Sequence, residues 1–196
     1  HSSDFKLDNN PVDGRITDLD RITALSKDPG IRLLLCDSTN AELRGSSISE
    51  SEVGDELEKI FMKFQQERII ATCFSSHIHR IQQIIDISKK QGRKVATLGF
   101  SMERNISLAR SLGVLSVAED DLVDISEIET YPKNQICVIS TGSQGEPRSS
   151  LNLSAQNSGK WLRIDENDVI IFSSRTIPGN EKRVARLINN LISLGA

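Results

Sequence analysis

Five polar segments of the sequence carry the hydroxyl groups and glycines that an anion-binding site needs. They are Asp37-Ser38-Thr39, Ser75-Ser76-His77, Gly99-Phe100-Ser101, Thr141 to Gly145, and Ser173-Ser174. Four arginines lie nearby, namely Arg80, Arg104, Arg148 and Arg175. Hydroxyls and free backbone N–H groups at helix starts bind phosphate, and arginines add charge-assisted contacts. Serine and glycine also cap helices in ordinary α/β proteins, so both interpretations stay open.

Two histidines two residues apart, His77 and His79, have the HxH spacing of zinc ligands. Near the start of a helix, side chains at this spacing point about 200° away from each other. The only other histidine is His1, and no nearby cysteine or carboxylate completes a tetrahedral set. We therefore expect a phosphate hydrogen bond from one of the two, or a structural histidine at a helix start.

Asp37 is the most prominent carboxylate because it follows an apolar run. Ile31 to Cys36 is apolar except for Arg32, which predicts a strand buried on both faces. Asp37 would then lie at the carboxyl end of that strand, where open α/β sheets bind ligands. The alternative is that Asp37 only turns the chain or caps a helix.

Three common site motifs are missing from the sequence. Neither GxGxxG nor GxxxxGK[ST] occurs, which disfavours a dinucleotide fold of the usual kind and a P-loop ATPase. The string Thr141-Gly142-Ser143-Gln144-Gly145 resembles GxSxG only loosely. A Ser-His-Asp hydrolase would need a late histidine, and none follows His79.

The elements that must position these residues alternate along the chain. Short apolar runs predict strands over residues 31–36, 68–74, 94–98, 135–140 and 169–173, with a further short strand at 161–164. Periodic apolar residues predict helices over 19–27, 50–64, 102–112 and 180–191, another from 81 to a stop at Gly92, and a weak one after Pro147. Ser49 with Glu52 forms a capping box, and Ser101 is placed to cap a helix. This βα alternation predicts an α/β fold of three layers, a mostly parallel sheet with helices on both faces, Rossmann-like without a dinucleotide fingerprint.

Composition indicates one globular domain that buries a core. The 196 residues are 37% hydrophobic and 26% charged, and the net charge of -3 argues against a protein that coats nucleic acid by bulk charge. No apolar run approaches the roughly 20 residues that span a bilayer. Cys36, Cys73 and Cys137 show no CxxC spacing, so we expect free thiols in a reducing cytoplasm.

Seven strings, in order along nearly the whole chain, resemble the β-CASP portion of the ribonuclease J family, RNases with a metallo-β-lactamase fold. They are Asp4-Phe5-Lys6-Leu7-Asp8, Asp37-Ser38-Thr39-Asn40-Ala41-Glu42, Ile78-His79-Arg80-Ile81-Gln82-Gln83, Gly92-Arg93-Lys94-Val95, Ser101-Met102-Glu103, Thr141-Gly142-Ser143-Gln144-Gly145-Glu146-Pro147 and Ile177-Pro178-Gly179-Asn180. The resemblance implies that residues 17–196 form a β-CASP domain. Residues 1–16 would be the tail of a metallo-β-lactamase domain, or a tag or linker.

The resemblance implies a cytoplasmic enzyme of rRNA processing and mRNA decay. Such enzymes degrade RNA from a 5′-monophosphate end, also cut internally, and form homo-oligomers. They use two zinc ions held by a metallo-β-lactamase domain of the same chain, and single-stranded RNA runs between the two domains. The family's HxHxDH motif and its last two histidine motifs do not occur here. We therefore expect this stretch to bind RNA without cleaving it.

The resemblance also assigns roles to individual residues. Asp4 matches a metal-bridging aspartate, and Asp37 matches an acidic motif that would orient a metal-ligand histidine outside this chain. Ser76, His77 and His79 lie where the family binds the terminal phosphate and first nucleotide of RNA. The remaining expected RNA contacts are Ser75, Arg80, Ser101, Ser143, Ser173 and Arg175.

Three positions depart from the family's usual pattern. Ser3 stands where a glycine is usual, so His1 to Ser3 are either tag or native residues. His77 replaces an asparagine, which puts the terminal-phosphate contact there in doubt. Arg175 lies in Ser173-Ser174-Arg175-Thr176, where the family tends to read SSSP, and it could add a phosphate contact.

Two other classes of function stay open. One is a non-catalytic β-CASP-like subunit that docks a partner nuclease and helps to hold RNA. The other is a nucleotide-binding regulatory domain, suggested only by the polar segments. An upstream HxHxDH motif in the parent protein would favour the enzyme, and its loss would favour the subunit.

Overall fold

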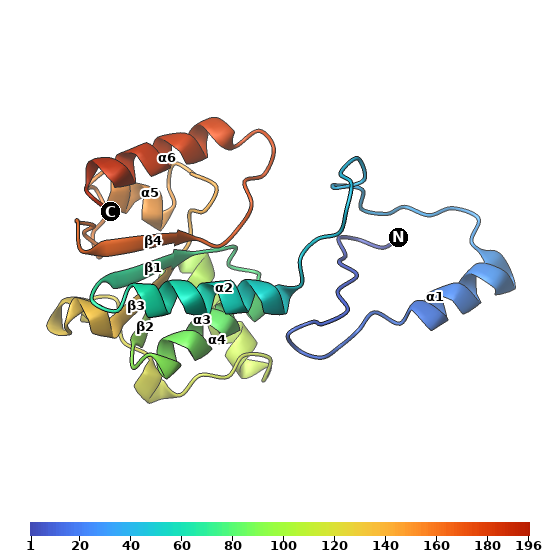
Figure 1. Cartoon of the computed structure of the whole chain (residues 1–196), viewed down its shortest axis with the longest axis horizontal. Helices are drawn as coiled ribbons and strands as arrows, with labels where there is room; N and C mark the ends of the chain where they lie inside the picture. Colours follow the sequence, from blue (N-terminus) through green and yellow to red (C-terminus); the bar gives the residue numbers. More distant parts are fainter. The chain divides into compact units, whose positions relative to one another are not determined.

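The computed structural model describes all residues 1–196 and divides the chain into two compact units (Figure 1). The first unit comprises residues 1–55 and the second comprises residues 56–196. Each unit is described by itself below. No helix in either unit is both long enough and apolar enough to cross a membrane.

The second unit is built on a four-stranded parallel sheet. Its strands are β1 (Arg68–Thr72), β2 (Lys94–Leu98), β3 (Ile136–Ser140) and β4 (Asp168–Phe172), in the order β2-β3-β1-β4. Every residue of β1 and β3 is buried, which explains their nearly continuous apolar sequence. Leu122 adds an isolated parallel bridge to Val95 at the outer edge of β2.

Helices cover both faces of this sheet. They are α2 (Glu50–Lys63, which begins in the first unit), α3 (Ile78–Lys90), α4 (Phe100–Ser111), α5 (Ser150–Ala155) and α6 (Glu181–Ser193). On one face, Ile70 and Val138 pack in a core cluster with Leu187 of α6. The neighbouring strand residues point to the other face, where Cys137 contacts Ser88 of α3. The predicted three-layer α/β fold with a parallel sheet is confirmed.

A buried ion pair fixes the amino ends of β1 and β4 side by side. Arg68 is 1% exposed, and its Nε and Nη2 donate to the two carboxylate oxygens of Asp168 at 2.8 and 2.9 Å. Its Nη1 also donates to Glu129 at 3.0 Å. Burial acts to lower the pKa of Arg68, but the two carboxylates outweigh it and the pKa is raised. The pair matches the register, in which Arg68 lies opposite Asp168.

The first unit contains α1 (Leu19–Leu25), a π-type turn over Ser26–Gly30, and no strand. The predicted strand over residues 31–36 is therefore wrong. Leu33 is 74% exposed. Within these residues, Leu35 O accepts a backbone hydrogen bond from Ser2 N. A strand needs a neighbouring strand for its N–H and C=O groups and a surface to cover its side chains, and residues 1–55 provide neither.

Polar contacts around Asp8 order the rest of the first unit. The Asp8 carboxylate accepts from the backbone N–H groups of Glu50 (2.8 Å) and Asn10 (2.9 Å), and these bonds lower its pKa to about 2. Ser49 donates its N–H to Glu52 Oε1 at 3.2 Å, which is one half of the predicted capping box. The Ser49 hydroxyl instead donates to Asn10 O at 2.8 Å.

Two further expectations about secondary structure need correction. Residues 161–164 form no strand, although Leu162 and Ile164 are buried in the core cluster, because their backbone does not pair with β4 or β2. Ser101 does not cap α4. The helix begins at Phe100, two residues earlier than predicted, and Gly99 takes the N-cap position with a φ of 117°.

Candidate functional site

The carboxyl ends of all four strands lie at one edge of the parallel sheet, and we call the loops there the polar edge. In Figure 1 the arrowheads of β1 and β4 point the same way, toward this edge. It comprises residues 73–80, 99–101, 141–145 and 173–180. The topology therefore brings together every residue of the second unit for which an RNA contact is predicted: Ser75, Ser76, His77, His79, Arg80, Ser101, Ser143, Ser173 and Arg175.

Arg80 joins the start of α3 to the end of β4. Arg80 is 7% exposed, and its Nη1 donates to the Ser173 carbonyl at 3.0 Å and to the Ser173 hydroxyl at 2.6 Å. Ser173 also donates its N–H to Thr72 O at 2.8 Å, which continues the pairing of β1 and β4. A cation is thus held within the polar edge by hydrogen bonds to the end of β4.

The loop after β1 presents Ser75, Ser76 and His77. Asn105 of α4 donates to the Ser75 carbonyl (2.9 Å) and hydroxyl (3.2 Å), which fixes the loop against the helix. Ser76 and His79 are exposed, and His77 is half-buried at the N-cap of α3. Asn105 was not predicted from the sequence, because an asparagine inside a helix carries no signal of a contact with another loop.

The loops after β3 and β4 are joined by Gln144, which sequence reasoning did not single out as a site residue. Its Nε2 donates to Arg175 O at 2.9 Å, and its Oε1 accepts from Ile177 N at 2.8 Å. Ser143, the adjacent predicted contact, is 4% exposed. The sequence shows only a glutamine between two glycines of a loop. Such a side chain can equally well lie in solvent, so the pattern did not predict the contact.

Gly145 allows this loop to lie directly against α6. Its φ is +67°, a conformation that favours glycine. A Cβ at this position would lie 2.6 Å from the carbonyl carbon of Arg183. Any side chain would therefore push the loop away from the helix backbone.

Ser101 and Arg175 are both exposed at the polar edge. Ser101 is the second residue of α4, so its hydroxyl is placed on the first helical turn and not at the cap. Arg175 has its backbone carbonyl bound by Gln144, while its side chain reaches solvent. Neither placement prevents a contact with an anion.

Asp4 and Asp37 lie in the first unit. Asp4 is exposed, whereas Asp37 accepts from Thr39 through the hydroxyl (2.6 Å) and the N–H (3.0 Å). These bonds lower the pKa of Asp37 and form the turn that the sequence left open as an alternative. A role in orienting a metal ligand stays a prediction.

The described residues contain no group of three or more His, Cys, Asp or Glu side chains placed to hold a metal ion. The two buried thiols are also poor nucleophiles. Burial raises the pKa of Cys73 to about 12 and that of Cys137 to about 11, so both are protonated at neutral pH. The chemistry that this arrangement offers is the binding of an anion through hydroxyls, N–H groups and cations.

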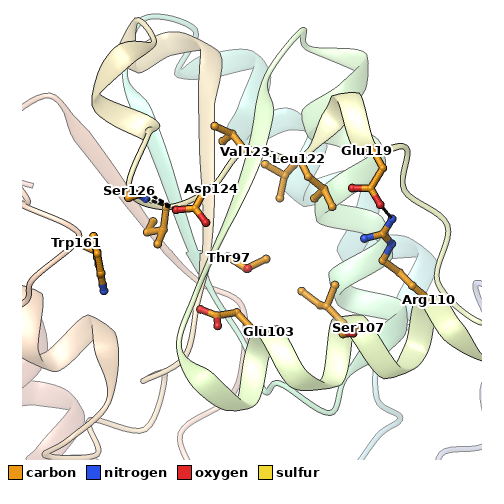
Figure 2. A pocket seen from close by; sticks show the side chains of 13 residues that line it. Thr97, Glu103, Ser107, Arg110, Glu119, Leu122, Val123, Asp124, Ser126 and Trp161 are labelled. Carbon is orange, nitrogen blue, oxygen red and sulfur yellow. Dashed lines mark hydrogen bonds and ion pairs between the residues drawn. The ribbon is translucent and has the colours of Figure 1, made fainter.

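A cavity of about 780 Å³ lies along the outer edge of β2 and one side of α4. Figure 2 shows Glu103 projecting from α4 on one wall and Asp124 opposite it. Two hydrogen bonds from Ser126 lower the pKa of Asp124, and Glu119 is paired with Arg110. Three carboxylates against one arginine disfavour a phosphate ligand here, and no predicted site residue lines this cavity.

Comparison with known proteins agrees with the geometry. The family model described as "Ribonuclease J, beta-CASP domain" matches residues 66–191. The chain is 45% identical over all 196 residues to ribonuclease J of Mycobacterium tuberculosis, covering 35% of that protein. It is 41% identical over all 196 residues to ribonuclease J of Thermus thermophilus and covers 34% of it. Over 192 residues it is 41% identical to ribonuclease J of Helicobacter pylori and covers 28% of it.

The chain thus spans about a third of the length of the curated relatives it matches. The matched region begins before β1 and ends within α6, so it contains the whole parallel sheet and the polar edge. The family match and the observed α/β fold lead to the same assignment, and the chain belongs to the ribonuclease J β-CASP domain family.

Proposed function

We propose that the polar edge binds single-stranded RNA, including its 5′-monophosphate, within a zinc-dependent ribonuclease J that trims RNA from the 5′ end and cuts internally. One observation carries this proposal. The hydroxyl-bearing loops after all four strands meet at one edge of the sheet, with Arg80 and Arg175 among them. Hydroxyls, N–H groups and guanidinium groups are the donors that phosphate oxygens accept.

The exposure of each residue would decide whether it contacts RNA directly. Ser76, His79 and Arg175 are exposed and can meet phosphate or sugar oxygens directly. Arg80 is buried, so it would contribute its charge and hold Ser173 in place. The chain has a net charge of -3, so binding would depend on this local array and not on overall attraction.

This chain by itself does not bring together the ligands of a zinc site. Because the described residues bring no three potential ligands together, we derive no catalytic step from them. We propose that the two zinc ions are bound outside this stretch and that Asp4 joins their ligands in the full protein. The purified chain should then show no RNA cleavage with zinc added, and zinc-dependent cleavage by it would contradict this part of the proposal.

Exposed leucines in the first unit support a contact with another domain of the same protein. Leu33, Leu34 and Leu35 are all more than half exposed, which is costly for an apolar run in water. We propose that a metallo-β-lactamase domain of the same chain covers them. Homo-oligomer formation and a cytoplasmic role in rRNA processing and mRNA decay belong to this proposal too. The three cysteines are free thiols, which suits a reducing compartment.

Binding can be tested with a matched pair of arginine variants. Arg175→Gln removes a cation of the polar edge, whereas Arg163→Gln removes an exposed cation from the cavity beside Arg68, near the amino ends of the strands. Fluorescence anisotropy with labelled, 5′-monophosphorylated decauridine should show weaker binding for Arg175→Gln, by about fivefold, and little change for Arg163→Gln.

The same assay decides between terminal and internal recognition. A 5′-hydroxyl decauridine should bind more weakly than the monophosphorylated one if the terminal phosphate is bound. Amide shifts of Ser76 and His79 in NMR titrations should move with RNA. No binding at millimolar RNA, or equal effects of the two arginine variants, would contradict the proposal. A non-catalytic subunit would give the same binding result, and an HxHxDH motif in the parent protein would exclude it.

A further inference from the structure

Gln144 makes the closest link between two loops of the polar edge. The residue is 3% exposed and follows the end of β3 by four positions. Its amide binds the backbone of the other loop twice, by donating to Arg175 O (2.9 Å) and by accepting from Ile177 N (2.8 Å). The orientation of the amide is determined by these partners, because a carbonyl only accepts and an N–H only donates.

Longer contacts surround this pair of hydrogen bonds. The amide nitrogen lies 3.4 Å from the Ser174 hydroxyl and 3.5 Å from the Ser143 hydroxyl, and Asn180 Nδ2 lies 3.4 Å from the amide oxygen. Four residues of the two loops therefore share one buried amide with the backbone of Ile177. We call this set of contacts the Gln144 clamp.

The backbone that carries Gln144 is itself held. Its N–H donates to Glu146 Oε2 at 3.3 Å, and the next residue is Gly145, whose backbone touches that of α6 at Arg183. The loop after β3 is thus a fixed anchor. The segment after β4 depends on it, since the side chains of Arg175, Thr176 and Ile177 are all exposed and no core packing positions them.

We propose that Gln144 is a positioning residue for RNA. The clamp holds the backbone at Arg175 and Ile177, so that the Arg175 guanidinium and the Ser174 hydroxyl are presented to phosphate oxygens in one arrangement. Without the clamp, RNA must order this segment when it binds, which lowers affinity although no direct contact is lost. This inference rests on the proposed RNA binding at the polar edge.

The test uses the 196-residue chain and a matched pair of glutamine variants. Gln144→Met keeps the shape of the side chain but removes both hydrogen bonds. Gln156→Met makes the same change at an exposed residue after α5. With labelled, 5′-monophosphorylated decauridine, the Kd should rise about tenfold for Gln144→Met and less than twofold for Gln156→Met.

Amide hydrogen exchange of the free chain reports on the clamp without RNA. Exchange at Ile177, the donor to Gln144, should become faster in Gln144→Met. Exchange at Ile70 and Val138 in the sheet should stay slow, which shows that the fold is intact. Unchanged exchange at Ile177, or an unchanged Kd, overturns the inference.

A glutamate variant gives a pH dependence of Kd that a general loss of structure would not produce. In Gln144→Glu, a carboxylate cannot donate to Arg175 O, whereas the protonated acid can. The charged groups around it are Glu146, which contacts the backbone of residue 144, and Arg175 and Arg183 in the segments packed on this loop. The ratio of the variant's Kd to the wild-type Kd should fall toward one as the pH is lowered from 8 to 5.

The outcomes separate this inference from the function on which it rests. Wild-type binding with a pH-independent ratio for Gln144→Glu overturns the positioning role and leaves RNA binding in place. No wild-type binding overturns RNA binding, and the positioning role with it, even if exchange at Ile177 responds to Gln144→Met. If Gln144→Met does not fold, Gln144→Glu at pH 5 and pH 8 decides the matter.

Discussion

The two units of the chain differ in how far their apolar residues are buried. Residues 56–196 bury Ile69, Ile139 and Leu187 completely, whereas no side chain in residues 1–55 is buried. Both units contain runs of leucine and isoleucine of similar length. The difference lies in the parallel sheet, which offers two faces for packing in one unit and is missing from the other.

This comparison shows what holds each unit together. The second unit combines core packing with a buried, bidentate Arg68–Asp168 pair. The first unit depends on hydrogen bonds of polar side chains, such as those of Asp8 and Ser49. The net contribution of one such hydrogen bond to the free energy of unfolding is about 1 kcal/mol. Burial of a leucine side chain contributes more. We therefore expect four experiments to separate the units.

Thiol labelling should give the largest difference. Cys36 in the first unit is exposed, while Cys73 and Cys137 are buried and their pKa values are raised to about 12 and about 11. A thiol-specific reagent at pH 8 should label Cys36 at least about a thousandfold faster, since the buried thiols react only after unfolding. A Cys36→Ser variant should show no fast phase. Rapid labelling of all three thiols would contradict the described core.

Equal truncations of two leucines should have unequal costs. Leu187→Ala creates a cavity in the core cluster and should lower the free energy of unfolding by about 2–5 kcal/mol. Leu34→Ala removes a side chain that is 61% exposed and should change it by no more than about 0.5 kcal/mol. Urea denaturation followed by circular dichroism measures both. Similar values for the two variants would remove the distinction between the units.

Two glycines with nearly the same φ allow a sharper comparison. Gly14 (φ 70°) has open space around a Cβ position, whereas a Cβ at Gly145 (φ 67°) would collide with α6. Alanine at either site costs about 1–2 kcal/mol for the backbone conformation, and Gly145→Ala adds about 1–3 kcal/mol for the collision. Thermal unfolding should therefore show a lower Tm for Gly145→Ala than for Gly14→Ala, and equal Tm values would argue against the close contact.

The smallest effect concerns the pH dependence of one contact in the first unit. The N–H groups of Glu50 and Asn10 lower the pKa of Asp8 from 3.8 to about 2. The stabilisation by this carboxylate is therefore complete above pH 3.8 and is lost as the pH falls through 2. The amide shift of Glu50 should titrate with a midpoint near 2 in NMR spectra. The transition should vanish in Asp8→Asn, and a midpoint near 3.8 would contradict the contact.

Much of the second unit was predictable from local sequence patterns. The strand at 94–98 was predicted with its observed bounds, and those at 68–74, 135–140 and 169–173 differ from β1, β3 and β4 only at their ends. These runs are apolar on both faces and are bounded by turn residues, which is the signature of buried parallel strands. The run at 31–36 has the same signature but forms no strand, because a strand exists only where a neighbour accepts its hydrogen bonds.

The candidate site was predictable in part for a related reason. Strand ends followed by serine, glycine and arginine indicated where polar side chains gather, because parallel strands place their carboxyl ends at one edge. Contacts between loops were not predictable, since Gln144 and Asn105 bind loops that lie about 30 residues away in the sequence. Such contacts depend on the positions of whole elements.

The sequence by itself determined the four strands of the sheet and the helices between them in residues 56–196, and its TGSQGEP and IPGN motifs indicated the family. Hydrophobic period and turn chemistry are local properties, so they can be read from neighbouring residues. The tertiary structure alone decided which apolar runs are buried and which side chains hydrogen-bond the loops of the polar edge to one another. Burial and long-range hydrogen bonds require partners distant in the chain, and their presence is settled only when the sheet and its helices are assembled.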